Sequence, residues 1–235
     1  MSGHSKWSQI KHKKAATDAK RGVLFGKLAR AITIAARGNP DPETNNRLHD
    51  EIGRARAANM PNESIARAIK RVTDKDAAAL EDLQLEFIGP GNTALLVTAI
   101  TDNGNRTIGE LRALAAPLGG SPASPGAVTW MFTRTGVITV TVPPARSDEA
   151  QLAAIDAGAS EVNYADGELT VLASPSVLSD VLASLPFPDA TSRVSFVPTT
   201  LNPLTDSGDQ QRLEGLIQAL EDHEDTQNVV SNADY

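Results

Sequence analysis

Basic side chains with a tryptophan among them crowd the beginning of this chain, and they are its residues most suited to ligand chemistry. The candidates for contact with a ligand are Lys6, Trp7, Lys11, His12, Lys13, Lys14, Lys20, Arg21, Lys27, Arg30 and Arg106. Lysine and arginine head groups bind phosphates and release counterions, and an indole ring stacks on an unpaired base. These residue types predict binding to a nucleic acid.

The spacing of the lysines adds to this prediction. Lys6, Lys13, Lys20 and Lys27 recur every seven residues. On a continuous helix they would form a stripe that drifts by only about 20° per heptad. The alternative is a solvated helix face, with Trp7 helping to dock that helix on its neighbours.

The charge of the chain is divided unevenly. Residues 1–75 hold 16 basic and 7 acidic residues, a net charge of +9, whereas 76–235 hold 6 and 22, a net charge of −16. Together they give the overall −7 and a pI near 5.1. A basic segment on an acidic protein indicates that one part meets a polyanion and the rest repels it.

Arg106 is the one candidate outside the basic segment. Residues 102–105 read as a turn from a strand into a helix, with Asn103 or Asn105 as the N-cap. A cation in the first turn of a helix opposes the helix dipole, which indicates a role facing an anion. A salt bridge to Glu86 or Glu110 is the alternative.

Metal binding, a phosphate-binding loop and catalysis find little support in the sequence. His4 and His12 lack a carboxylate or third ligand and lie among lysines, so a metal site is not expected. The glycine-rich residues 89–92 join two predicted strands and indicate a hairpin turn, not a phosphate loop. His223 lies among acids and is expected to be a solvated helix-end residue. With no catalytic or dinucleotide motif, we expect a protein that is not an enzyme and uses no cofactor or small-molecule substrate.

Hydrophobic periodicity predicts three helices in the basic segment. The first covers 23–36, the second begins at Pro42, and the third follows Pro61. Further along, a hairpin is expected over 83–100, then a helix at 105–116 and a strand at 128–133. Residues 136–198 follow the β-α-β-β-α-β order of a ferredoxin-like unit, with its first strand at 137–142.

The last elements are a helix near 210–221 and a strand near 227–231, which are too small to fold alone. We therefore predict an α+β protein of three domains: a helical bundle, a discontinuous α+β domain and an inserted ferredoxin-like domain. The predicted boundaries are 1–78, then 79–134 with 200–235, and 135–199. The absence of cysteine and of a long apolar run leads us to expect a cytoplasmic protein without a membrane partner.

Short motifs throughout the chain also resemble a known family. They are GHSKW at 3–7, IKHKKAA at 10–16, DAKR at 18–21, ANMP at 58–61, IARAIK at 65–70, GPG at 89–91, TDNGNRT at 101–107, VTWMF at 128–132 and ALED at 219–222, with Val229 and the final Asn232, Ala233 and Asp234. The sequence resembles the YebC/PmpR family of probable transcriptional regulators over its whole length. The resemblance implies a three-domain protein that binds nucleic acid and regulates gene expression, with mitochondrial relatives that activate translation.

The chain departs from the family pattern at a few places in its second half. Gly104 replaces a usual arginine, Leu118 replaces a usual histidine, and the segment after Val197 is short and divergent. Three functions are considered, and the first is favoured by the family resemblance. The first is a transcriptional regulator that binds DNA through its basic N-terminal domain. The second is a translation factor that binds RNA or the ribosome, which is favoured by Trp7 and by the lack of an obvious helix-turn-helix in the sequence. The third is a protein-interaction scaffold.

Overall fold

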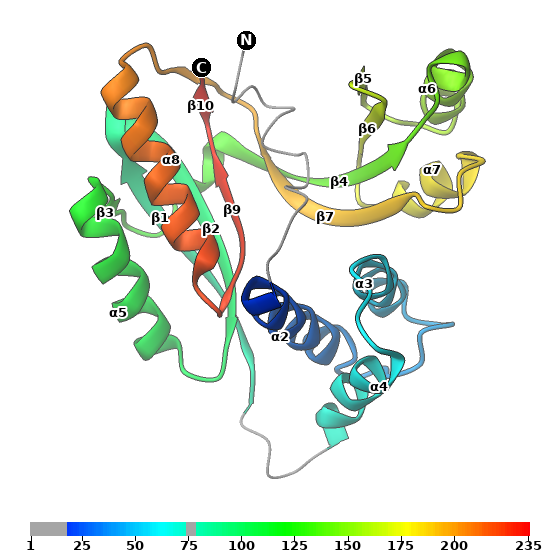
Figure 1. Cartoon of the computed structure of the whole chain (residues 1–235), viewed down its shortest axis with the longest axis horizontal. Coiled ribbons are helices and arrows are strands. Elements are labelled where there is room, and N and C mark those ends of the chain that lie inside the picture. The colour runs from blue at the N-terminus through cyan, green and yellow to red at the C-terminus, as the bar shows by residue number, and fades with distance from the viewer. Residues whose placement is uncertain (1–17, 74–78) are drawn as a thin grey trace.

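The computed structural model describes residues 18–73 and 79–235 (Figure 1). For residues 18–20 and 73 it describes only the backbone. It contains a group of helices and two four-stranded sheets, each sheet covered by helices. This confirms the predicted α+β class. Across the described residues, no helix has the length and apolar character needed to cross a membrane.

The N-terminal helices pack around a small core of their own. They are α2 (Asp18–Ala35), α3 (Asn46–Ala57) and α4 (Asn62–Lys70). Their buried residues include Leu28, Ile32, Leu48, Ile52, Met60 and Ile65. These side chains recur at helical spacing, so each helix turns one apolar stripe toward the other two. We call α2, α3 and α4 the helical unit.

The second helix does not start where the sequence suggested. Pro42 lies in a turn, and α3 begins at Asn46 after the N-cap Asn45, whose Oδ1 accepts from Leu48 N at 3.1 Å. The same side chain donates from Nδ2 to the carbonyl oxygens of Ala35 (2.8 Å) and Asn39 (2.6 Å). Asn45 therefore caps α3 and also satisfies the end of α2, which Pro42 cannot do.

The first sheet combines strands from two distant parts of the chain. Its members are β1 (Glu81–Gly89), β2 (Thr93–Thr101), β3 (Ser121–Pro122) and β9 (Thr226–Ser231), in the order β3-β1-β2-β9. All three pairings are antiparallel. The turn between β1 and β2 needs Gly91, which has φ +63° and approaches Leu204 too closely for a side chain. A short parallel pair, β8 (Asn202–Pro203) and β10 (Ala233–Asp234), lies at the C-terminus.

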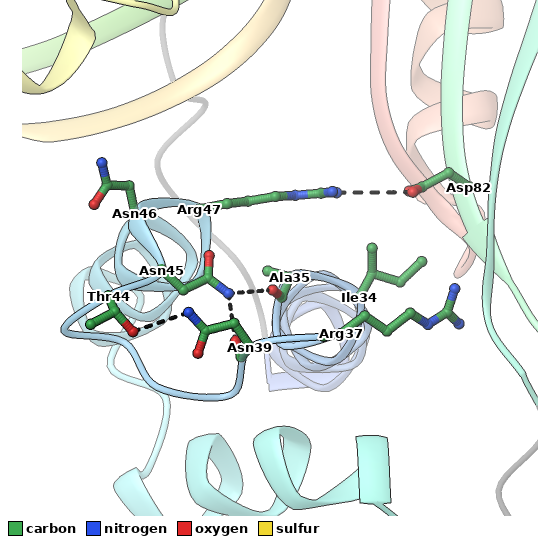
Figure 2. Close-up of a pocket in the computed structure, with 10 residues that line it drawn as sticks. Ile34, Ala35, Arg37, Asn39, Thr44, Asn45, Asn46, Arg47 and Asp82 are labelled. Carbon is green, nitrogen blue, oxygen red and sulfur yellow. Dashed lines mark hydrogen bonds and ion pairs between the residues drawn. The ribbon is translucent and has the colours of Figure 1, made fainter.

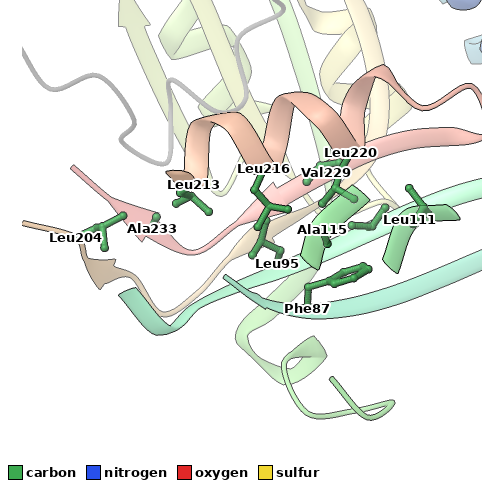
Figure 3. Packing of buried hydrophobic residues seen from close by; sticks show 11 residues of the cluster. Phe87, Leu95, Leu111, Ala115, Leu204, Leu213, Leu216, Leu220, Val229 and Ala233 are labelled. Atoms are coloured by element: carbon green, nitrogen blue, oxygen red, sulfur yellow. The ribbon is translucent and has the colours of Figure 1, made fainter. Parts of the chain in front are cut away.

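Both faces of this sheet are covered. The helices α5 (Gly104–Ala115) and α8 (Ser207–Asp222) pack on one face, where Phe87 and Leu95 meet Leu111 and Leu216 (Figure 3). On the other face, Ile34 of α2 packs with Ile100 of β2. Because alternate residues of a strand point to opposite faces, burial on both sides explains the unbroken apolar run of β2.

The second sheet has the ferredoxin-like order. Its strands are β4 (Phe132–Thr141), β5 (Glu161–Ala165), β6 (Glu168–Ala173) and β7 (Thr191–Pro198), arranged β5-β6-β4-β7 and all antiparallel. The helices α6 (Ser147–Asp156) and α7 (Leu178–Ser184) pack with them around one core. The long strands β4 and β7 run back toward the first sheet (Figure 1).

The strand predicted at 128–133 is correct only for its last two residues, Phe132 and Thr133. Residues Thr129–Met131 form a 3-10 turn, and β4 then runs unbroken through Gly136. A Cβ atom at Gly136 would lie 2.7 Å from Leu178 Cδ1, so this glycine lets α7 approach the strand and does not mark a turn. The boundary predicted between 134 and 135 falls inside β4.

The helical unit also touches the second sheet. Ser192 Oγ of β7 donates to Asp50 Oδ1 of α3 at 3.2 Å. Burial raises the pKa of Asp50, and the bond from Ser192 opposes that rise. The helical unit is therefore in contact with both sheets.

Candidate nucleic-acid interface

The predicted ligand-binding residues fall into three groups in the structure. Lys6, Trp7, Lys11, His12, Lys13 and Lys14 lie outside the described residues. Lys20 and Arg21 lie in the first turns of α2, and Arg21 is exposed. Lys27, Arg30 and Arg106 come together at one place, which the sequence did not indicate.

That place is the acidic end of α8 and the turn that follows it. We call Glu221, Asp222, Glu224 and Asp225 the acidic loop. Lys27 Nζ donates to the carbonyl oxygen of Glu221 at 2.5 Å, and Arg30 Nη1 donates to that of Glu224 at 2.6 Å. Burial lowers the pKa of Lys27, although the charge of Glu221 opposes this shift. Two predicted phosphate ligands thus hold α2 against the second half of the chain.

Asp225 is the centre of this contact. Its carboxylate is 1% exposed and lies 3.2 Å from Arg30 and 3.0 Å from Arg106. It also accepts from Thr107 Oγ1 at 2.7 Å. Burial alone would raise the pKa of Asp225, but the bonds from Thr107 and Arg106 and the charge of Arg30 outweigh it and lower that pKa. The carboxylate is therefore held ionised between two arginines.

Arg106 forms salt bridges within the chain, which is the alternative that the sequence left open. Besides Asp225, it lies 3.0 Å from Asp102 and 3.9 Å from Glu110. Asn103 is the N-cap of α5, and its side chain accepts from the backbone of Arg106. Of the two predicted partners, Glu110 is present at the longer distance and Glu86 lies elsewhere.

Glu110, His223 and Asp225 are close enough to be considered as metal ligands. His223 Nδ1, however, accepts from the backbone N–H of Asp225 at 3.2 Å, which leaves Nε2 to donate to Glu110 at 3.0 Å. Both ring nitrogens are therefore used, and two arginines beside Asp225 would repel a cation. The cluster is better explained as an ion-pair network. The His223 side chain is only 9% exposed, so the expectation of a solvated residue is wrong.

A polar depression of about 650 Å³ lies where the helical unit meets β1 (Figure 2). Arg37 donates to the carbonyl oxygen of Leu80, and Arg47 lies 3.9 Å from Asp82 of β1. The Arg47 and Asp82 side chains are both more than half exposed. Arginines at the rim of an open polar depression could bind phosphates, but here an acid shares the site.

Sequence reasoning missed a second set of exposed basic residues on the helical unit. They are Arg56 of α3, Arg67 and Lys70 of α4, and Arg71 just after it. In α4 the buried residues are Ile65 and Ala68, which leaves Arg67 and Lys70 on the outer side. The helical spacing of Ile65 and Ala68 was the available signal for this.

Comparisons with known proteins agree over the whole chain. Residues 5–75 match the TACO1/YebC protein N-terminal domain, and residues 80–233 match the TACO1/YebC second and third domain. A "Probable transcriptional regulatory protein" of Moorella thermoacetica is 46% identical, covering 100% of this chain and 96% of that protein. A second protein of the same name, from Roseiflexus castenholzii, is 45% identical, covering 99% of this chain and 94% of that protein.

A solved structure shows the same fold. The crystal structure of a conserved hypothetical protein from Aquifex aeolicus superposes with a TM-score of 0.88 at 36% sequence identity, covering 97% of this chain and 96% of that one. Matches of this extent leave no part of the described fold unaccounted for. The chain therefore belongs to the TACO1/YebC family.

Proposed function

We propose that this protein regulates gene expression by binding DNA through its basic N-terminal region, residues 1–78. The observation that carries the proposal is the division of charge between this region, at +9 over residues 1–75, and the rest of the chain, at −16. Relatives of similar length carry the name "Probable transcriptional regulatory protein", which agrees with this role.

The surface of the helical unit supports the proposal. Among the exposed charged residues of 21–72, basic side chains outnumber acidic ones by seven to three. The basic ones are Arg21, Arg37, Arg47, Arg56, Arg67, Lys70 and Arg71, and the acidic ones are Asp41, Glu43 and Glu63. Such a surface attracts phosphates from a distance and adds to the lysines before residue 18.

The connection between α3 and α4 supports DNA in particular. Four residues, Ala58 to Pro61, join the two helices, and Asn59 takes φ +60° in the turn. Helix pairs with turns of three or four residues are typical of helix-turn-helix proteins, in which the second helix enters the major groove. Asn62, Arg67 and Lys70 on the exposed side of α4 have side chains that can contact bases and phosphates.

Lys27, Arg30 and Arg106 have a different part in this proposal. Lys27 and Arg30 hold α2 against the acidic loop, and Arg106 of α5 binds Asp225 of the same loop. We propose that they position the basic surface and that the residues before Lys27 make most of the phosphate contacts. The acidic half then repels the polyanion and restricts it to one side of the protein.

The test is charge reversal at two lysines of the seven-residue stripe. Lys13→Glu with Lys20→Glu should weaken binding to a mixed-sequence DNA duplex by tenfold or more at fixed salt, as measured by fluorescence anisotropy. Arg112→Glu with Arg212→Glu is the matched control, because it makes the same charge change on α5 and α8. Equal losses in both double variants would show that net charge alone matters and would contradict the proposal.

Binding to RNA is the second candidate. It is favoured by Trp130 in the acidic half, whose exposed side chain could stack on an unpaired base. Crosslinking in cells, followed by sequencing of the bound nucleic acid, distinguishes the two. Recovery of genomic DNA supports transcriptional regulation, whereas recovery of ribosomal or messenger RNA supports a translation factor.

A further inference from the structure

Trp130 is the exposed aromatic side chain of the described residues. Its relative exposure is 66%, whereas every other described phenylalanine, tyrosine and tryptophan is buried or half-buried. Its indole Nε1–H donates to the carbonyl oxygen of Ala127 at 3.0 Å, which fixes one edge of the ring. A large apolar side chain held in solvent in this way points to a contact surface.

The turn that carries Trp130 is firmly held. The buried carboxylate of Glu86 accepts from the backbone N–H groups of Gly126 (2.6 Å), Val128 (2.6 Å) and Thr129 (3.1 Å). Burial raises the pKa of Glu86, but these bonds outweigh it and lower that pKa. On either side of Trp130, Val128 and Phe132 enter the core beneath. A ring mounted so rigidly loses little entropy when it binds.

Acidic residues are missing around Trp130 in the sequence, although the surrounding half of the chain is strongly acidic. Residues 111–147 contain no Asp or Glu. The segment 190–205 also lacks acids, and Thr199 of this segment bonds to Met131 beside the tryptophan. The acid in contact with the turn is Glu86, whose carboxylate is buried and accepts from three backbone N–H groups of the turn.

The tryptophan turn also lies on the side of β1 that meets the helical unit. Along that strand Asp82 reaches Arg47 of α3, Gln84 donates to Thr129 Oγ1 at 3.0 Å, and Glu86 holds the turn itself. Alternate residues of a strand share one side and are about 7 Å apart. A nucleic acid on the helical unit therefore needs only a few nucleotides to reach the tryptophan turn.

We propose that Trp130 stacks on an unpaired base of a single-stranded segment whose phosphates are held by the exposed basic side chains of the helical unit. This inference rests on the proposed function and adds a second contact to it. Stacking on an aromatic ring needs no particular base, since every base presents a π face. The proposal therefore predicts that Trp130 contributes to the binding of single strands and not to that of duplexes, with no strong sequence preference at this position.

The experiment compares the full-length parent with Trp130→Ala, Trp130→Phe and the control Leu152→Ala, which removes a side chain of 61% exposure from α6. The probes are a labelled 12-nucleotide oligouridine, the oligothymidine of equal length and a 12-base-pair DNA duplex, all at one salt concentration. Trp130→Ala should weaken both single strands tenfold or more and change duplex binding less than twofold. Trp130→Phe and Leu152→Ala should stay within a few-fold of the parent.

The three probes also distinguish an RNA base from a DNA base, and they distinguish failure of stacking at Trp130 from failure of the proposed function. A loss with oligouridine alone assigns the base to RNA, and a loss with both strands assigns it to single strands in general. If Trp130→Ala binds all probes as the parent does, while Lys13→Glu with Lys20→Glu loses binding, stacking at Trp130 is wrong and the proposed function stands. A parent that binds none of the probes overturns both. Circular dichroism of each variant confirms that the fold is retained.

Discussion

The Arg30 guanidinium of α2 lies 3.2 Å from the buried carboxylate of Asp225, 195 residues further along the chain. This ion pair joins the basic helical unit to the acidic half at the point where Arg106 and Thr107 also meet Asp225. Opposite charges that the sequence keeps apart are therefore neutralised at one internal contact. The basic surface left exposed lies at the start of α2 and on α3 and α4.

Asp225 is expected to be essential for stability. Asp225→Ala would leave Arg30, Arg106 and Thr107 without their shared acceptor and should lower the free energy of unfolding by about 3 kcal/mol. Thermal unfolding should shift downward by roughly 10 °C. The control is Glu224→Ala, which removes a 65% exposed partner of the same arginine and should cost about 0.5 kcal/mol or less. Similar losses in both variants would contradict the central role of Asp225.

Acid should destabilise the protein through the same carboxylate and through Glu86. The pKa values of both are lower in the folded protein than their usual values. Their stabilising effect is therefore complete above pH 5 and is lost as the pH falls through the folded pKa. Urea unfolding between pH 3 and 6 should show stability falling with acid, and Asp225→Asn should flatten this dependence. An unchanged slope in the Asn variant would show that other groups cause the acid loss.

Exposed basic residues of the helical unit and those paired with the acidic loop should respond differently to charge reversal. Arg67→Glu with Arg71→Glu changes exposed side chains, so we expect weaker binding to DNA and stability within about 1 kcal/mol of the parent. Arg30→Glu places a carboxylate beside Asp225 and should unfold the contact between α2 and the acidic loop. Thermal melts and anisotropy titrations on the same samples check both. A stable Arg30→Glu variant that loses DNA binding would show that Arg30 is a phosphate ligand.

Most elements could be predicted from the sequence because their signals are local. Asp166 and Gly167 take positive φ values between β5 and β6, and an Asp-Gly pair between two strands is a strong local signal for such a turn. The start of α3 could not be predicted, because Asn45 becomes its N-cap through side-chain bonds to the end of α2 and the residues after it. The unbroken course of β4 depends on Leu178 packing over Gly136, a contact across 42 residues.

The internal ion pairs could not be predicted either, because their partners are distant in the sequence. A lysine or arginine in a basic segment has the same sequence signature whether it faces phosphate or a distant carboxylate. Lys27 and Arg30 find partners 194 residues away, and nothing local marks those partners. Trp130 was visible in the sequence as part of a motif, but its exposure depends on how Glu86 folds the turn beneath it.

Electrostatic binding of DNA by the basic N-terminal region is tested by the salt dependence of the association constant of the full-length protein. If the basic N-terminal region makes about six phosphate contacts, the association constant should fall by roughly three decades between 50 and 200 mM salt. Lys13→Glu with Lys20→Glu should make the log–log slope shallower by about 2, because two contacts are lost. An affinity that hardly changes with salt, or a slope that the double variant leaves unchanged, would contradict the claim.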